Sequence, residues 1–172
     1  MKTAPAVMRR ASRRIACGLA YGLVTLGLAA APGAAGAADR PTEELALGRY
    51  LVQTAGCNDC HTPGYGATAG KAPEAEWLTG DRLGWQGPWG TTYPTNLRRH
   101  FANLSEADWM AYARSGESRP PMPWFNLRVM ADAELKAIYR YIKAAGPAGE
   151  PAPAYVPPGG KASGPVVVFP AP

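Results

Sequence analysis

Apolar positions recur every three or four residues in three stretches of the chain, which is the spacing of a helix with one buried face. The predicted helices cover residues 42–55, with Thr42 as N-cap, residues 105–116, and residues 132–145. A glycine inside the first helix costs about 1 kcal/mol relative to alanine, so either another helix crosses closely there or the cost is tolerated. The positions that define these faces are Leu45, Gly48, Val52 and Ala55, then Trp109, Met110, Tyr112 and Ala113, then Leu135, Ile138, Tyr139, Tyr141 and Ile142.

Two other stretches lack this periodicity. Residues 62–103 are rich in glycine, contain four prolines and hold several large aromatic residues: Trp77, Trp85, Trp89 and Tyr93. This composition predicts a long, ordered loop region and not a sheet, and a loop of this length in a compact domain needs something large to wrap. From Gly146 onward, eight prolines fall within 27 residues. That density predicts an extended, poorly ordered tail over residues 147–172, able to lie along the domain.

An uncharged apolar run at residues 15–31 follows four arginines and precedes the small residues Ala35-Gly36-Ala37. This order is typical of a secretory signal peptide, which we place at residues 1–37, and it predicts export to the periplasm. An uncleaved anchor is the alternative, because the run is only slightly shorter than the ~20 residues of a spanning helix. The first 37 residues hold five of the 18 basic residues and none of the 13 acidic ones, so the mature chain is near neutral. This balance excludes a general electrostatic case for nucleic-acid binding, and signal cleavage leaves no general membrane binding.

The most specific motif is a pair of cysteines followed directly by a histidine: Cys57, Cys60 and His61. Two thiols at this spacing reach the two vinyl groups of one porphyrin and form thioethers, while the adjacent imidazole binds the iron. The motif therefore predicts one covalently attached haem c. A closed zinc site usually needs four ligands, and only His100 remains as a further histidine. A redox dithiol is expected beside a βαβ pattern, and the chain has almost no strand signal.

The second axial ligand of the iron has four candidates in the mature chain: Met110, Met122, Met130 and His100. Met110 lies in the middle of a predicted amphipathic helix and Met130 lies just before the third helix, so both are interpreted as packing residues. Met122 has a proline on each side, which restricts the backbone and lowers the entropy lost in holding a weak thioether ligand. We predict that Met122 binds the iron, with ligation through His100 as the alternative.

Four segments resemble the class I c-type cytochromes: Gly48-Arg49-Tyr50, Cys57-Asn58-Asp59-Cys60-His61, Pro121-Met122-Pro123 and Tyr139-Arg140-Tyr141-Ile142-Lys143. The resemblance covers most of residues 42–145. It implies an all-α cytochrome c fold over residues 38–146, with three to four helices and long loops wrapped around one haem. In that family the glycine of the first helix packs on an aromatic residue of the last, which implies contact between Gly48 and Tyr141. The resemblance also implies that Pro63 lies near the proximal histidine and Asn96 near a haem propionate.

The expected function is the transfer of single electrons between a donor and an acceptor protein through transient contacts, and not enzymatic catalysis. The polar stretch Arg98-Arg99-His100 is a candidate docking patch, or a partner for the haem propionates. Tyr93, Asn96-Leu97 and residues 121–124 also resemble segments of cytochrome subunits from periplasmic quinoprotein and flavoprotein dehydrogenases. An electron-accepting subunit of such a dehydrogenase or of a respiratory complex is therefore the alternative. A haem enzyme with an exchangeable sixth ligand is the third interpretation.

Overall fold

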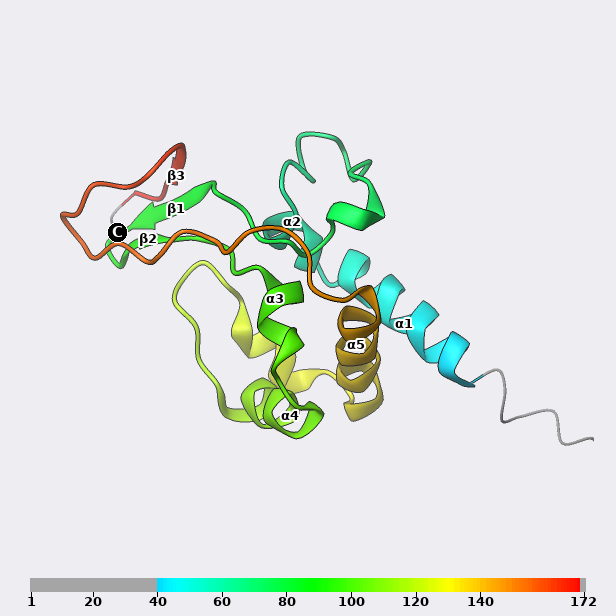
Figure 1. Cartoon of the computed structure of the whole chain (residues 1–172). Helices are drawn as coiled ribbons and strands as arrows, with labels where there is room; N and C mark the ends of the chain where they lie inside the picture. Colours follow the sequence, from blue (N-terminus) through cyan, green and yellow to red (C-terminus); the bar gives the residue numbers. More distant parts are fainter. Residues whose placement is uncertain (1–39, 171–172) are drawn as a thin grey trace, which may run out of the picture. The chain divides into compact units, whose positions relative to one another are not determined.

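The structure is a computed structural model that describes residues 40–170. The predicted signal peptide and its alternative, the uncleaved anchor, lie outside the described residues. Among residues 40–170, no helix is both long enough and apolar enough to cross a bilayer. The elements follow the order α1 (Arg40–Thr54), α2 (Cys57–His61), the 3-10 helix η1 (Glu74–Glu76), β1 (Gly84–Gly87), β2 (Gly90–Thr92), α3 (Leu97–Ala102), α4 (Glu106–Ser115), the 3-10 helix η2 (Trp124–Val129), α5 (Asp132–Ala145) and β3 (Val166–Val168), as Figure 1 shows.

Helices α1 and α5 form the central contact of the fold, and they cross at a glycine. Gly48 is buried, and a Cβ atom built on it would lie 2.6 Å from the Cβ atom of Tyr141 and would also collide with the backbone carbonyl of Ala137. The expected contact between Gly48 and Tyr141 is therefore confirmed, and it explains the glycine inside α1. The apolar face of α5, including Leu135 and Ile138, is buried in the same core.

The helix boundaries agree with the sequence pattern where a local cap defines them. α4 begins after Ser105, whose Oγ accepts a hydrogen bond from the backbone N–H of Asp108 at 3.1 Å, and the helix ends before Gly116 as predicted. α5 covers the predicted residues 132–145. The N-cap prediction for α1 is wrong, because the helix already begins at Arg40 and runs through Thr42.

A three-stranded sheet, in the order β2-β1-β3, corrects the prediction that residues 62–103 contain no sheet. β1 pairs with β2 as an antiparallel hairpin and with β3 in parallel. The strands are only three or four residues long and include Gly84, Gly87 and Gly90, so they carry no alternating apolar pattern. At Gly84 a Cβ atom would lie 2.7 Å from the Thr91 side chain, so the hairpin itself requires a glycine there. The all-α expectation did not include this sheet.

The C-terminal segment is ordered against the sheet, which corrects the prediction of a poorly ordered tail for the described residues 147–170. Val156 forms an isolated bridge with Thr91, and the Val166–Val168 strand completes the sheet. Phe169 packs between two indole rings, with centroid distances of 5.9 Å to Trp85 and 5.4 Å to Trp89. Figure 1 shows this orange and red segment running beside β1 and β2, so it belongs to the same structural unit as the domain.

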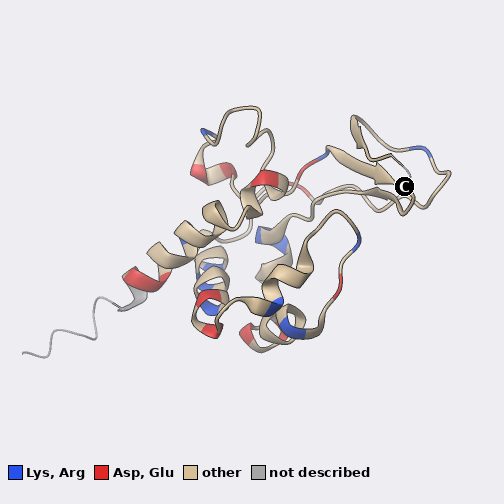
Figure 2. Cartoon of the chain, turned by 180° about the vertical axis from the view of Figure 1, so that it is seen from behind, with Lys and Arg blue, Asp and Glu red and all other residues tan. Residues whose placement is uncertain are grey.

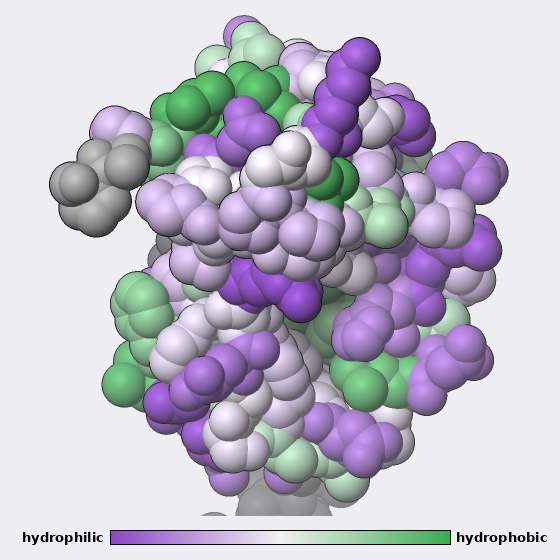
Figure 3. Space-filling view, turned by 90° about the vertical axis from the view of Figure 1, so that its left-hand side faces the viewer, coloured by the Kyte–Doolittle hydropathy of each residue, from purple (hydrophilic) through white to green (hydrophobic). Residues whose placement is uncertain are grey.

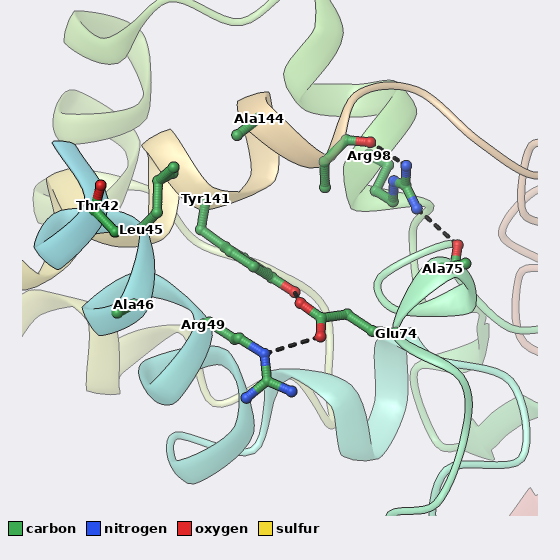
Figure 4. Close-up of a pocket in the computed structure, with 10 residues that line it drawn as sticks. Thr42, Leu45, Ala46, Arg49, Glu74, Ala75, Arg98, Tyr141 and Ala144 are labelled. Carbon is green, nitrogen blue, oxygen red and sulfur yellow. Dashed lines mark hydrogen bonds and ion pairs between the residues drawn. The ribbon is translucent and has the colours of Figure 1, made fainter.

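A polar network joins the loop before the sheet to α1 and α5 (Figure 4). The Glu74 carboxylate accepts hydrogen bonds from the Tyr141 hydroxyl at 2.8 Å and from Arg49 Nε at 2.9 Å. Partial burial alone would raise the pKa of Glu74, but these two hydrogen bonds, together with the charge of Arg49, outweigh it and hold the pKa below its usual value. Burial raises the pKa of Tyr141, and the hydrogen bond to the Glu74 carboxylate and its negative charge raise it further. The network lines a surface pocket with the apolar side chains of Leu45 and Ala144.

Basic and acidic residues are interspersed along the helices and loops, as the blue and red segments of Figure 2 show. The ion pairs of the described residues link neighbouring elements, for example Arg140 of α5 with Glu44 of α1 and Glu106 of α4. Figure 3 views the end of the molecule that carries the sheet and shows polar side chains intermixed with separate apolar patches.

Candidate functional site

The cysteine and histidine motif forms its own short helix, α2, directly after α1. Gly56, with a φ of 75°, lets the chain turn between the two helices in a left-handed conformation that favours glycine. Asn58 is fully buried, and its Oδ1 accepts a hydrogen bond from Thr62 Oγ1 at 2.8 Å. The Thr62 hydroxyl in turn accepts the backbone N–H of Leu78 at 2.8 Å. One side of α2 is thereby fixed to the following loop.

His61 is buried, and its ring orientation is set by a backbone carbonyl. Nδ1 lies 2.7 Å from the carbonyl oxygen of Thr95, which requires Nδ1 to be the donor. Nε2 therefore keeps its lone pair, which is the form that binds a metal. Burial lowers the pKa of His61, and the Thr95 contact opposes that shift only in part. The imidazole is held neutral and oriented for ligation.

Thr95 was not identified from the sequence, because a backbone acceptor leaves no signature in residue type. The expectation that Pro63 lies near the proximal histidine holds only along the chain. Pro63 is exposed on the turn after α2 and does not line either of the cavities beside His61. The contact that orients the ring comes instead from Thr95, in the segment that follows β2.

Both thiols of α2 are free and partly buried. Burial raises the pKa of Cys57 to about 11, and burial followed by the charge of Asp59 also raises the pKa of Cys60. Reactive dithiols require the opposite, a pKa lowered toward neutrality by a positive environment. The redox-dithiol interpretation is therefore disfavoured by the surroundings of these cysteines.

Two adjoining cavities open beside α2. The first, of about 350 Å³, is lined by both cysteines, His61 and Met122, with apolar walls from α3, α4, η2 and α5 that include Phe101, Trp109, Leu127 and Ile138. The second, of about 700 Å³, lies toward the sheet and the C-terminal segment. Cys60, His61 and Met122 line both cavities. The structure thus brings these predicted ligands together on the lining that the two cavities share.

The other candidates for the second axial ligand are placed differently. His100 and Met130 line the first cavity only, whereas Met110 lines neither. Met110 instead packs against the hydrophobic core, as its position in α4 predicted. Of the four candidates, Met122 lines both cavities, as His61 does, and His100 shares only the first cavity with His61.

Two buried polar atoms on the wall of the second cavity have no hydrogen-bond partner among the described residues: Nε1 of Trp85 and Oγ1 of Thr92. A buried donor without a partner costs about 1–3 kcal/mol. A positive charge lies on the same wall, because the Arg119 guanidinium stacks 3.9 Å from the ring centroid of Tyr155. An anionic group with acceptor oxygens suits this wall, as the propionates of a haem would.

The donor set as a whole fits haem c. It combines two thiols at thioether spacing, one neutral imidazole, one thioether sulfur, apolar walls and free donors for carboxylates. Among residues 40–170 there is no group of three or more His, Cys, Asp or Glu side chains arranged to hold a metal ion.

Asn96 has a role different from the expected propionate contact. Its Oδ1 caps α3 by accepting the backbone N–H of Arg99 at 3.0 Å. Its Nδ2 donates to the carbonyls of Ala148 at 2.8 Å and Glu150 at 3.0 Å. Both amide hydrogens are therefore used to hold the C-terminal segment, and no donor remains for a propionate.

The stretch Arg98-Arg99-His100 does not form a common docking patch. Arg98 is 9% exposed and donates to the carbonyls of Ala75 at 2.8 Å and Gly146 at 2.6 Å, and also to that of Ala145. Arg99 donates to the carbonyl of Gly149 at 3.1 Å. Arg98 is thus buried and committed to the end of α5, which argues against its role in docking or propionate binding, whereas Arg99 and His100 are exposed and their candidate roles stay predictions.

Comparison with protein-family models, with curated proteins and with solved structures found no match to this chain.

Proposed function

We propose that this chain is an exported electron-transfer protein that carries one covalently attached haem c. The observation that supports this most strongly is the single space lined by Cys57, Cys60, His61 and Met122. The cysteines and the histidine are neighbours in sequence, but Met122 reaches the same space from a loop between α4 and η2. A chance resemblance to the motif would not require a thioether to line the same space.

Each residue has a distinct role in this proposal. Cys57 and Cys60 would hold the porphyrin through thioether bonds, and His61 and Met122 would bind its iron. Haem bound in this way supplies reversible one-electron Fe(III)/Fe(II) chemistry, and methionine ligation favours the ferrous state and raises the reduction potential. The carbonyl oxygen of Thr95 lies 2.7 Å from Nδ1 of His61 and keeps the imidazole in the tautomer that binds a metal through Nε2.

Two features of the site would favour electron transfer over oxygen chemistry: its apolar walls limit water, and its two protein ligands would occupy the iron. Phe101, Trp109 and Ile138 are each at most 6% exposed and exclude water from one side of the space. With His61 and Met122 both bound to the iron, no position would be left for a substrate. The protein then exchanges electrons by brief contact with a donor and an acceptor, through interfaces that are typically below about 1,200 Å².

A redox titration of the purified mature protein tests this function. We expect a single reversible transition with the slope of a one-electron couple, 59 mV for each tenfold change in the ratio of oxidised to reduced protein. We expect the ferrous spectrum to change only slowly when carbon monoxide is added, because Met122 must first leave the iron. A protein without a reversible couple is not an electron carrier, and immediate binding of carbon monoxide would favour the haem-enzyme interpretation.

The place of action proposed is the periplasm, because thioether attachment follows export and residues 1–37 carry a signal-peptide pattern.

A free carrier and a subunit of a larger dehydrogenase would share the same site. In the structure the C-terminal segment binds its own sheet rather than projecting away, which favours the free carrier. Copurification of the native protein with a larger enzyme would instead favour the subunit.

A further inference from the structure

The loop that carries Met122 has few backbone restraints. It connects the end of α4 at Ser115 to the start of η2 at Trp124. Among the described residues, no backbone-to-backbone hydrogen bond involves residues 117–121. The backbone of Met122 itself accepts one hydrogen bond, from the N–H of Trp124 at 2.9 Å, but a thioether is a weak ligand and residues 117–121 add no backbone hydrogen bond that would keep it on a metal. Side chains must therefore hold the loop in place.

Arg128 of η2 contacts both ends of this loop. Its Nη2 lies 3.3 Å from the carbonyl oxygen of Gly116 and 3.6 Å from a carboxylate oxygen of Glu117, at the beginning of the loop. Its guanidinium carbon lies 4.3 Å from the ring centroid of Trp124, at the end of the loop. The Arg128 side chain thus contacts both ends of the loop that carries Met122.

The backbone of Arg128 is itself anchored to α4. Arg114 Nη1 donates to the carbonyl of Arg128 at 2.8 Å, and Arg114 Nη2 donates to the carbonyl of Met130 at 2.9 Å. Arg114 also pairs with Asp132 at the start of α5. Because η2 is fixed in this way, the Arg128 side chain acts from a rigid base and not from a mobile segment.

We propose that Arg128 is a positioning residue that keeps the Met122 loop closed over the site, and so keeps the thioether opposite His61. This inference rests on the proposed haem function and adds a residue outside the cavity to it. The planar guanidinium is suited to this role because it stacks on the Trp124 ring while its N–H groups reach Gly116 and Glu117. A lysine keeps the charge but does not reproduce both contacts.

The test compares two variants. Each of them removes one partly exposed arginine whose side chain makes polar contacts with two other residues. Arg128→Gln removes the loop contacts, whereas Arg140→Gln removes the pairs with Glu44 and Glu106 and leaves the loop untouched. Carbon monoxide binds ferrous haem only after methionine leaves, so its binding rate reports opening of the loop. We expect Arg128→Gln to raise that rate about tenfold, which corresponds to about 1.4 kcal/mol, and Arg140→Gln to leave it unchanged.

Other measurements keep this inference separable from the proposed function. The weak long-red absorption band of methionine bound to ferric iron is expected to disappear on heating at a lower temperature in Arg128→Gln than in Arg140→Gln, when both are compared with their global unfolding. Should Arg128→Gln fail to accumulate, Glu117→Gln is expected to change the rate in the same direction, by two- to threefold. Equal rates in the Arg128, Glu117 and Arg140 variants would overturn the role of Arg128. Absence of the band from the wild-type protein would overturn the methionine ligation itself.

Discussion

Substitution of Gly48 by alanine is expected to separate α1 from α5 and to destabilise the protein. A methyl group at this position would lie 2.6 Å from the Cβ atom of Tyr141 and would also collide with the carbonyl group of Ala137. One of these obstacles is backbone and the other is the root of a side chain, so neither moves by a simple rotation about a side-chain bond. The two helices must therefore shift relative to each other.

The magnitude follows from two opposing effects. Inserting a methyl group into a tightly packed contact costs about 1–3 kcal/mol, and a backbone obstacle places Gly48 at the upper end of this range. Replacing glycine by alanine inside a helix returns about 1 kcal/mol through helix propensity. We therefore expect the free energy of unfolding to fall by about 2 kcal/mol.

Urea unfolding, followed by circular dichroism of the haem-loaded protein, measures this change. The matched control is Gly66→Ala, because nothing lies within 4 Å of a Cβ atom built on Gly66 and its φ is not in the left-handed region. That control is expected to be neutral or to stabilise by up to about 1 kcal/mol. A Gly48 variant as stable as the wild type would refute the close crossing of the two helices.

Three further predictions concern the site and the network beside it. Met122→Ala is expected to abolish the long-red band of the ferric protein, whereas Met130→Ala keeps it; the reverse result in the absorption spectra would move the ligand to Met130. Trp85→Phe removes a free donor from the cavity wall and is expected to lower the reduction potential by about 20–60 mV, on the scale of 59 mV per tenfold change, and an unchanged potential would contradict a propionate at this wall. Glu74→Gln is expected to cost at most about 1 kcal/mol, since the carboxylate is 46% exposed. The pKa of Glu74 is lowered in the folded protein, so its carboxylate contributes to stability above pH 4.5, its ordinary pKa, and this contribution is lost as the pH falls further. The difference in urea stability between wild type and variant must therefore shrink on acidification.

Features with a local cause were predictable from the sequence. The cap at Ser105 and the extent of α5 follow from residues adjacent in the chain, and the structure has both where expected. The packing of Gly48 on Tyr141 came from a family resemblance and not from periodicity, because the pattern of α1 alone left the glycine unexplained.

Features formed by distant segments were not predictable. β3 pairs with β1 from more than 70 positions away, and both strands are too short to show a pattern. Thr95 acts through its backbone carbonyl, which every residue type possesses. The roles of Asn96 and Arg98 depend on carbonyl groups of residues 145–150, whose position becomes known only when the C-terminal segment is placed. Contacts through backbone atoms do not depend on residue type, so no sequence pattern indicates them.

The central claim is that Cys57 and Cys60 together bind a porphyrin covalently, and the mass of the exported protein tests it most directly. Mass spectrometry of the natively produced mature chain, after extraction with acidified organic solvent, is expected to show the polypeptide plus one haem. Replacing both cysteines by alanine must remove that added mass. A colourless wild-type protein, or one that loses all its pigment to the solvent, would contradict the account.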